Sequence, residues 1–136
     1  MSPDLQATLM VVHHEPSVCQ SLTDLLNAEG YLVTSATNGP RALALAVETQ
    51  PDLILLDCVM PYLDGLAVLR GLRQEGHRGS VIVLAADETL EAAREAMSLD
   101  AYDYIIEPIN VDLLKEIVRE GLENGVPGSR DLACVF

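Results

Sequence analysis

The sequence has few basic residues. Eight lysines and arginines stand against 21 aspartates and glutamates in 136 residues, which gives a formal net charge of -13. Nucleic acids and anionic membranes attract basic surfaces, so this charge balance argues against both as partners. A protein partner or a small ligand is the better expectation.

Cysteine is also scarce, and long apolar runs are missing. The three cysteines, Cys19, Cys58 and Cys134, lack the spacing of a metal motif, and an odd number cannot all pair within one chain. This usage is typical of a reducing compartment. No apolar run approaches the roughly 20 residues of a membrane span, and the first residues lack the features of a signal peptide. We therefore expect a cytoplasmic protein without membrane association.

What the sequence does contain is an alternation of short apolar runs with longer segments whose apolar residues recur at helical spacing. This pattern predicts βα units around a parallel sheet. We expect an α/β fold, a (βα)5 doubly wound five-stranded parallel sheet with helices on both faces. One domain should cover residues 1–123, with 124–136 as a C-terminal tail or linker stub. The predicted strands are 9–12, 31–36, 52–57, 80–86 and 104–106, and the predicted helices are 16–29, 41–49, 66–72, 90–97 and 113–122.

Side chains able to do chemistry follow these predicted strands. In doubly wound sheets, sites form at the carboxyl ends of the strands. This rule brings five positions toward one edge of the sheet: His13, His14, Asp57, Ala85 and Glu107. The nucleotide-binding patterns G-x-G-x-x-G and G-x-x-x-x-G-K-[ST] do not occur, which disfavours a nucleotide-binding enzyme.

Two stretches resemble a known family. The segment PDLILLDCVMPYLDGLAVLRGLR (51–73) is similar to the phosphoacceptor strand, MPxxDG loop and following helix of bacterial response-regulator receiver domains. The segment DYIIEPI (103–109) resembles the DYxxKP segment of the same family. The resemblance covers roughly residues 8–123 and implies the flavodoxin-like receiver fold. It also implies that Asp57 accepts a phosphoryl group in a two-component phosphorelay and that Tyr104 is the switch aromatic.

The resemblance fails at every other position around Asp57. Receiver domains carry two acidic residues that hold Mg²⁺, a hydroxyl residue and a lysine. Here these positions hold His13 and His14, Ala85, and Glu107. Asp100 is a further departure, because it stands where the family usually has glycine, and it predicts a changed turn.

These substitutions predict a degenerate pocket. Mg²⁺ prefers oxygen ligands, and imidazole is a poor substitute. A unit charge pair 4 Å apart is worth about 4 kcal/mol at an effective dielectric constant of 20, and Glu107 reverses the sign of that interaction. We therefore expect impaired Mg²⁺-dependent phosphorylation of Asp57, no bound metal or other cofactor, and no catalytic residues, so that the protein is not an enzyme.

The two histidines suggest a charge-swapped pocket. An imidazole beside Asp57 and Glu107 gains from protonation, so one or both histidines are predicted to pair with these carboxylates and hold the edge in a single state. The simpler interpretation is that at least one of His13 and His14 faces solvent, because adjacent strand residues point in opposite directions.

The preferred function is an atypical receiver that acts as a protein-interaction module in signal transduction. Its expected partners are a histidine kinase, an output domain or another signalling protein. A homodimer is one expectation, through the face of the fourth helix, fifth strand and fifth helix, which would include Arg94, Tyr104 and Lys115.

Two alternatives stay open. Asp57 could still be phosphorylated by a dedicated histidine kinase. The chain could instead be a metal- or ligand-binding sensor that uses His13, His14 and Asp57, although adjacent ligands at a strand end are not a spacing that argues for a metal.

Overall fold

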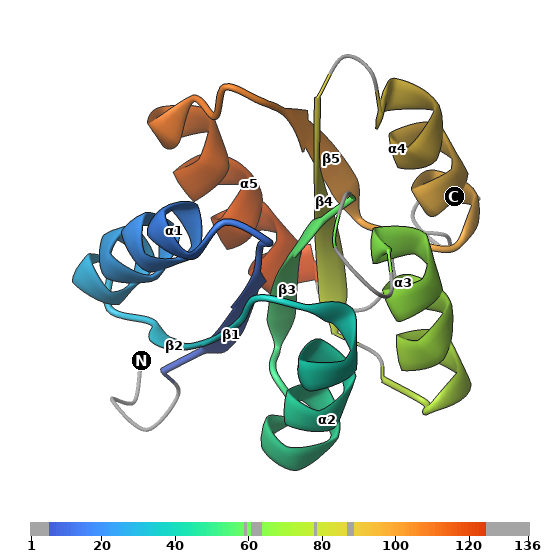
Figure 1. Cartoon of the computed structure of the whole chain (residues 1–136). Helices are drawn as coiled ribbons and strands as arrows, with labels where there is room; N and C mark the ends of the chain where they lie inside the picture. Colours follow the sequence, from blue (N-terminus) through green and yellow to red (C-terminus); the bar gives the residue numbers. More distant parts are fainter. Residues whose placement is uncertain (1–5, 59, 61–63, 78, 87–88, 125–136) are drawn as a thin grey trace.

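The computed structural model of the chain describes residues 6–58, 60, 64–77, 79–86 and 89–124. Within these ranges, five strands alternate with five helices (Figure 1). None of these described helices is long and apolar enough to cross a membrane. The elements are β1 (Thr8–Val12), α1 (Pro16–Ala28), β2 (Leu32–Ala36), α2 (Gly39–Thr49), β3 (Leu53–Asp57), α3 (Gly65–Gln74), β4 (Ser80–Ala85), α4 (Leu90–Ser98), β5 (Asp103–Ile106) and α5 (Val111–Asn124).

The strands form one parallel sheet in the order β2-β1-β3-β4-β5. The helices cover both faces, α1 and α5 on one and α2, α3 and α4 on the other (Figure 1). Every residue of β3 and β4 is buried, as expected for central strands whose two faces are both covered. The predicted doubly wound α/β fold is confirmed.

The second helix starts earlier than predicted. It begins at Gly39 instead of near residue 41, because the Asn38 side chain accepts a hydrogen bond of 2.9 Å from the Arg41 backbone N–H. Proline is tolerated in a first helical turn, so Pro40 does not interrupt the helix. Residues 38–40 therefore form the start of the helix. The last helix continues to Asn124, and the predicted tail lies almost entirely outside the described residues, so it stays a prediction.

The residue at the predicted turn change, Asp100, has a left-handed backbone conformation. Asp100 has φ of 68°, the left-handed conformation that glycine adopts most easily, and its carbonyl oxygen accepts a 3.0 Å hydrogen bond from Arg73. Aspartate tolerates this conformation better than most residues, so it can stand in the turn between α4 and β5 at a position that suits glycine.

This turn predicts a stabilising substitution. Asp100→Gly should raise the free energy of unfolding by about 0.5–1 kcal/mol, because glycine adopts positive φ without a steric cost. Urea denaturation measures the change. The matched control is Asp112→Gly in the first turn of α5, which should lower stability by a similar amount, about 0.5–1 kcal/mol, because helical glycine is unfavourable. A loss of stability in both variants would contradict the assignment of strain to Asp100.

Candidate functional site

The five predicted site residues lie at one edge of the sheet. His13 and His14 directly follow β1, Asp57 ends β3, Ala85 ends β4, and Glu107 directly follows β5. The parallel registers of β1 with β3 and of β4 with β5 align these strand ends. The structure therefore brings together the side chains of His13, His14, Asp57 and Glu107, through the contacts described below.

Asp57 is a buried carboxylate with defined donors. Only 3% of the residue is exposed. Its Oδ2 atom accepts hydrogen bonds from the His14 backbone N–H at 3.2 Å and from His14 Nδ1 at 2.5 Å. The start of α3 packs closely behind it, and a Cβ on Gly65 would clash with the Asp57 carbonyl oxygen and lie 2.9 Å from Cys58 Cα. Glycine at position 65 therefore lets α3 approach the backbone that carries Asp57.

The contact between His14 and Asp57 fixes a proton on the histidine ring. An ionised carboxylate only accepts hydrogen bonds, so His14 Nδ1 must be the donor. The hydrogen bond to Asp57 raises the pKa of His14, against an opposing effect of partial burial, and the charges of Asp57, Glu15 and Glu107 raise it further. His14 is therefore held toward its protonated, positive form beside Asp57.

His13 has a different role in the same cluster. It is 1% exposed, and its Nδ1 atom accepts a 3.1 Å hydrogen bond from the Glu15 backbone N–H. The proton of the ring is therefore on Nε2, which donates to Glu107 Oε2 at 3.2 Å. His13 Nδ1 lies 3.7 Å from Asp57 Oδ2. In this arrangement His13 is the neutral tautomer and separates two carboxylates.

These contacts refine the charge-swap prediction. Both histidines pair with a carboxylate, His14 with Asp57 and His13 with Glu107, but only His14 is arranged to carry a positive charge. The two imidazole rings stack with centroids 5.1 Å apart and planes 16° apart. The prediction that at least one of the two histidines faces solvent holds for His14, because 39% of its side chain is exposed, although the same ring also bonds Asp57. His13 is buried.

Ala85 ends β4, and Tyr104 lies within β5. Ala85 is buried, and its carbonyl oxygen accepts a 2.7 Å hydrogen bond from the Glu107 backbone N–H. The Tyr104 side chain is partly buried against the apolar cluster under α2, α3 and α4. Tyr104 therefore packs against the apolar core.

Among the residues that the structure describes, one group of side chains could hold a metal ion. His13, His14 and Asp57 each offer one donor atom, and these three atoms lie within 4.8 Å of one another. Cys58 follows Asp57 and is also buried, and burial raises the pKa of its thiol to about 12, with a further contribution from the Asp57 charge. Cys58 therefore stays protonated.

Residues 9–119 match the family model of the response regulator receiver domain. The chain belongs to this family. It is 34% identical over 115 residues to the regulatory protein AtoC of Escherichia coli, a match that covers 85% of this chain and 25% of AtoC. It is 28% identical over 114 residues to sporulation initiation phosphotransferase F of Bacillus subtilis, which covers 84% of this chain and 92% of that protein.

Solved receiver structures agree with the fold. The receiver domain of NtrX from Brucella abortus superposes with a TM-score of 0.80 at 28% identity, covering 85% of this chain and 98% of that one. A response regulator receiver domain protein from Clostridium thermocellum gives a TM-score of 0.82 at 25% identity, covering 86% of this chain and 94% of that one. This chain spans only 25–50% of the length of the first curated relatives, AtoC, DctR of Priestia megaterium and ZraR of Salmonella typhimurium.

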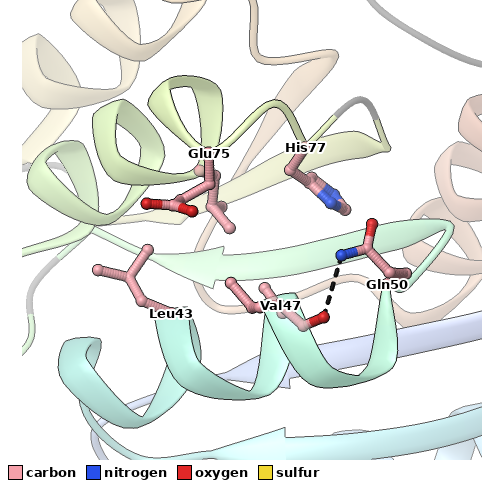
Figure 2. A pocket seen from close by; sticks show the side chains of 7 residues that line it. Leu43, Val47, Gln50, Glu75 and His77 are labelled. Atoms are coloured by element: carbon pink, nitrogen blue, oxygen red, sulfur yellow. Dashed lines mark hydrogen bonds between the residues drawn. The ribbon is translucent and has the colours of Figure 1, made fainter.

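The receiver domain has a second feature that the sequence did not reveal. A cavity of about 70 Å³ lies between α2 and the end of α3, and Figure 2 shows His77 and Gln50 on its wall. His77 is 8% exposed, and its Nε2 atom has no hydrogen-bond partner among the described residues. Gln50 and His77 precede β3 and β4, so this cavity lies at the amino ends of the strands, opposite Asp57. A lone histidine in a loop gives no sequence signal for such burial.

The His14 pairing predicts a titration that NMR can follow. In metal-free buffer the pKa of His14 should lie above its ordinary value of about 6.5 and fall toward it in Asp57→Asn, which keeps an acceptor but removes the charge. Because the folded-state pKa is raised, the stabilising contribution of His14 is complete below about pH 6.5 and is lost as the pH rises through the folded pKa. The His77 titration is the internal control. A His14 pKa that is the same in both proteins would contradict the pairing.

His77 predicts the opposite dependence of stability on pH. Burial, and then the charge of Arg73, lowers the pKa of His77. Its contribution to stability is therefore complete above about pH 6.5 and is lost as the pH falls through the folded pKa. Urea denaturation between about pH 5 and about pH 8 should show a shallower acidic loss in His77→Gln than in the wild type. Equal acidic slopes in the two proteins would show that His77 is not the group that titrates.

Proposed function

We propose that this receiver domain is an atypical one, a protein-interaction module whose active surface does not depend on Mg²⁺-dependent phosphorylation of Asp57. The observation that carries the proposal is the engagement of the phosphoacceptor itself. The Asp57 carboxylate is buried, and its Oδ2 atom is bonded to both the backbone and the ring of His14. A cation or phosphoryl donor that needs Oδ2 would therefore compete with His14 for this atom.

The chemistry of the neighbouring donors supports the same proposal. The resemblance to the family implies that Mg²⁺ neutralises charge during phosphoryl transfer, and Mg²⁺ demands several oxygen ligands in near-octahedral geometry. Two of the positions that would supply them are imidazoles. Glu107, the remaining carboxylate of the cluster, is turned to the Nε2 edge of His13, whereas Asp57 lies on the Nδ1 edge. The residues present therefore do not fit Mg²⁺.

The residues that couple phosphorylation to the rest of the domain in this family are also replaced at two positions, 85 and 107. Ala85 has no hydroxyl group to bond a phosphoryl oxygen. Glu107 stands where the family has a lysine, so it would repel a bound phosphoryl group that a lysine would attract. This repulsion is strong in a partly buried site, because water screens it less there. Tyr104 packs against the core with no polar partner at position 85 to move it.

The partners that fit this reading are proteins: a histidine kinase, an output domain or another signalling protein, in the cytoplasm and without nucleic acid or membrane contact. A homodimer through α4, β5 and α5 remains part of the proposal. Arg94 on α4 is exposed and bonds only Glu91 of its own helix among the described contacts. Lys115 is different, because its Nζ atom lies 3.3 Å from Glu29 at the end of α1, which turns it away from α4.

A working phosphoacceptor is the competing function. The match to sporulation initiation phosphotransferase F over 92% of its length favours a role in phosphoryl transfer, since that protein is named as a phosphotransferase. In that case a dedicated kinase would have to phosphorylate Asp57 beside His14 and supply the positive charge that the family takes from Mg²⁺ and lysine.

NMR spectra with a phosphoryl mimic decide between these functions. Millimolar Mg²⁺ with beryllofluoride should leave the ¹H–¹⁵N spectrum of the wild-type domain unchanged around Asp57. A variant that restores the family's residue types, His13→Asp, His14→Asp, Ala85→Thr and Glu107→Lys, should instead show shifts near Asp57. Wild-type shifts that spread from Asp57 to Tyr104 and α4 would refute the proposal and establish a working acceptor.

A further inference from the structure

We propose that His13, His14 and Asp57 bind a divalent transition-metal ion of the zinc class, with Glu107 orienting His13. This inference goes beyond the proposed function, because it gives the receiver domain an input other than a phosphoryl group. It uses the same edge of the sheet, but a different ion and a different set of donor atoms from those that Mg²⁺ requires.

The first support is the convergence of donors. One nitrogen from each histidine and one Asp57 oxygen lie within 4.8 Å of one another. A tetrahedral ion holds nitrogen and oxygen donors at about 2.0–2.2 Å, so that neighbouring donors are about 3.3–3.6 Å apart. The distances from Asp57 Oδ2 to His14 Nδ1 and to His13 Nδ1 are 2.5 Å and 3.7 Å, which straddle this value. Small movements of the His14 ring and of the Asp57 carboxylate would therefore bring these donors to the separations that a tetrahedral ion requires.

The second support is the far side of the His13 ring. His13 Nδ1 lies 3.7 Å from Asp57 Oδ2 and now accepts from the Glu15 backbone N–H, while Nε2 donates to Glu107 Oε2 at 3.2 Å. Histidines that ligate metals nearly always donate their other ring N–H to a carboxylate or carbonyl, which fixes the tautomer and makes the ligand more basic. Glu107 thus explains both the tautomer and the orientation of a buried histidine.

The hydrogen bonds that an ion would replace at this cluster can be given up at low cost. His13 Nδ1 would give up the N–H of Glu15, whose side chain is 58% exposed, so water can reach that part of the chain. The proton on His14 Nδ1 would leave to solvent as the ion takes its place beside Asp57. The His14 side chain is 39% exposed, which provides a path for the ion.

The donor types select the class of ion. Two imidazoles and one carboxylate suit Zn²⁺, Co²⁺, Ni²⁺ or Cu²⁺, whereas Mg²⁺ and Ca²⁺ prefer oxygen alone. Three protein ligands also leave a fourth position for water or an external ligand. A carboxylate from a partner protein is one chemistry that could fill it.

Calorimetric titration of Zn²⁺ into the full 136-residue chain, in metal-free buffer with a competing chelator, tests the site. We expect one ion per chain. Glu107→Gln should weaken Zn²⁺ binding by about 10- to 100-fold, the usual effect of losing the partner of a ligating histidine. Glu48→Gln makes the same chemical change at an exposed position of α2 and should leave the affinity unchanged. His14→Gln, which removes a ligand, should weaken binding more than Glu107→Gln does.

Two measurements on the wild-type chain keep the test independent of how the variants fold. Zn²⁺ should shift the imidazole NMR signals of His13 and His14 and leave those of His77 in place. Co²⁺ should give visible absorption bands of nitrogen and oxygen ligands without an intense thiolate-to-metal band, which separates this site from the cysteines.

The site is refuted if Zn²⁺ does not bind, if Glu107→Gln and Glu48→Gln have the same affinity, or if Co²⁺ shows thiolate ligation. The result of the beryllofluoride experiment described above does not depend on the result of the Zn²⁺ titration. A response to beryllofluoride would overturn the proposed interaction module and leave the Zn²⁺ result standing.

Discussion

The burial of the Asp57 carboxylate is the constraint on which the arrangement of the edge depends. Only 3% of the residue is exposed, and a buried anion is costly unless donors or a counter-charge surround it. The first residues after β1 supply both, through the backbone N–H and the protonated ring of His14. The position of that ring then determines where His13 can lie, because the two imidazoles stack.

The neutral ring of His13 lies between the carboxylates of Asp57 and Glu107 at this edge of the sheet. Its Nδ1 atom accepts from the Glu15 backbone, and its Nε2 atom donates to Glu107, so each side of the ring has a defined role. A protonated His13 would lose the hydrogen bond from Glu15, since both ring nitrogens would then be donors. The positive charge of the cluster is thereby confined to His14, where 39% of the side chain is in contact with water.

Sequence patterns predicted the sheet well, because the signals were strong and local. The apolar residues 53–56 indicated a central strand buried on both faces. The rule that sites form at the carboxyl ends of strands then placed Asp57 beside the residues that follow β1. The directions of His13 and His14 could not be predicted, because the alternation rule stops where the strand stops. Side-chain capping at Asn38 and positive φ at Asp100 were also missed, since each depends on a single residue and not on a pattern.

The fold and the chemistry of this edge vary independently for a physical reason. The two apolar clusters that stabilise the sheet contain neither histidine of the edge, nor Asp57, nor Glu107. Substitutions at these four positions therefore change charge and donor type while the backbone, held by the clusters, keeps the strand ends in place. Family membership accordingly predicts where the donors lie, and the identity of the donors decides which ion or charge they hold. Two imidazoles in place of two carboxylates move that preference from Mg²⁺ toward softer ions.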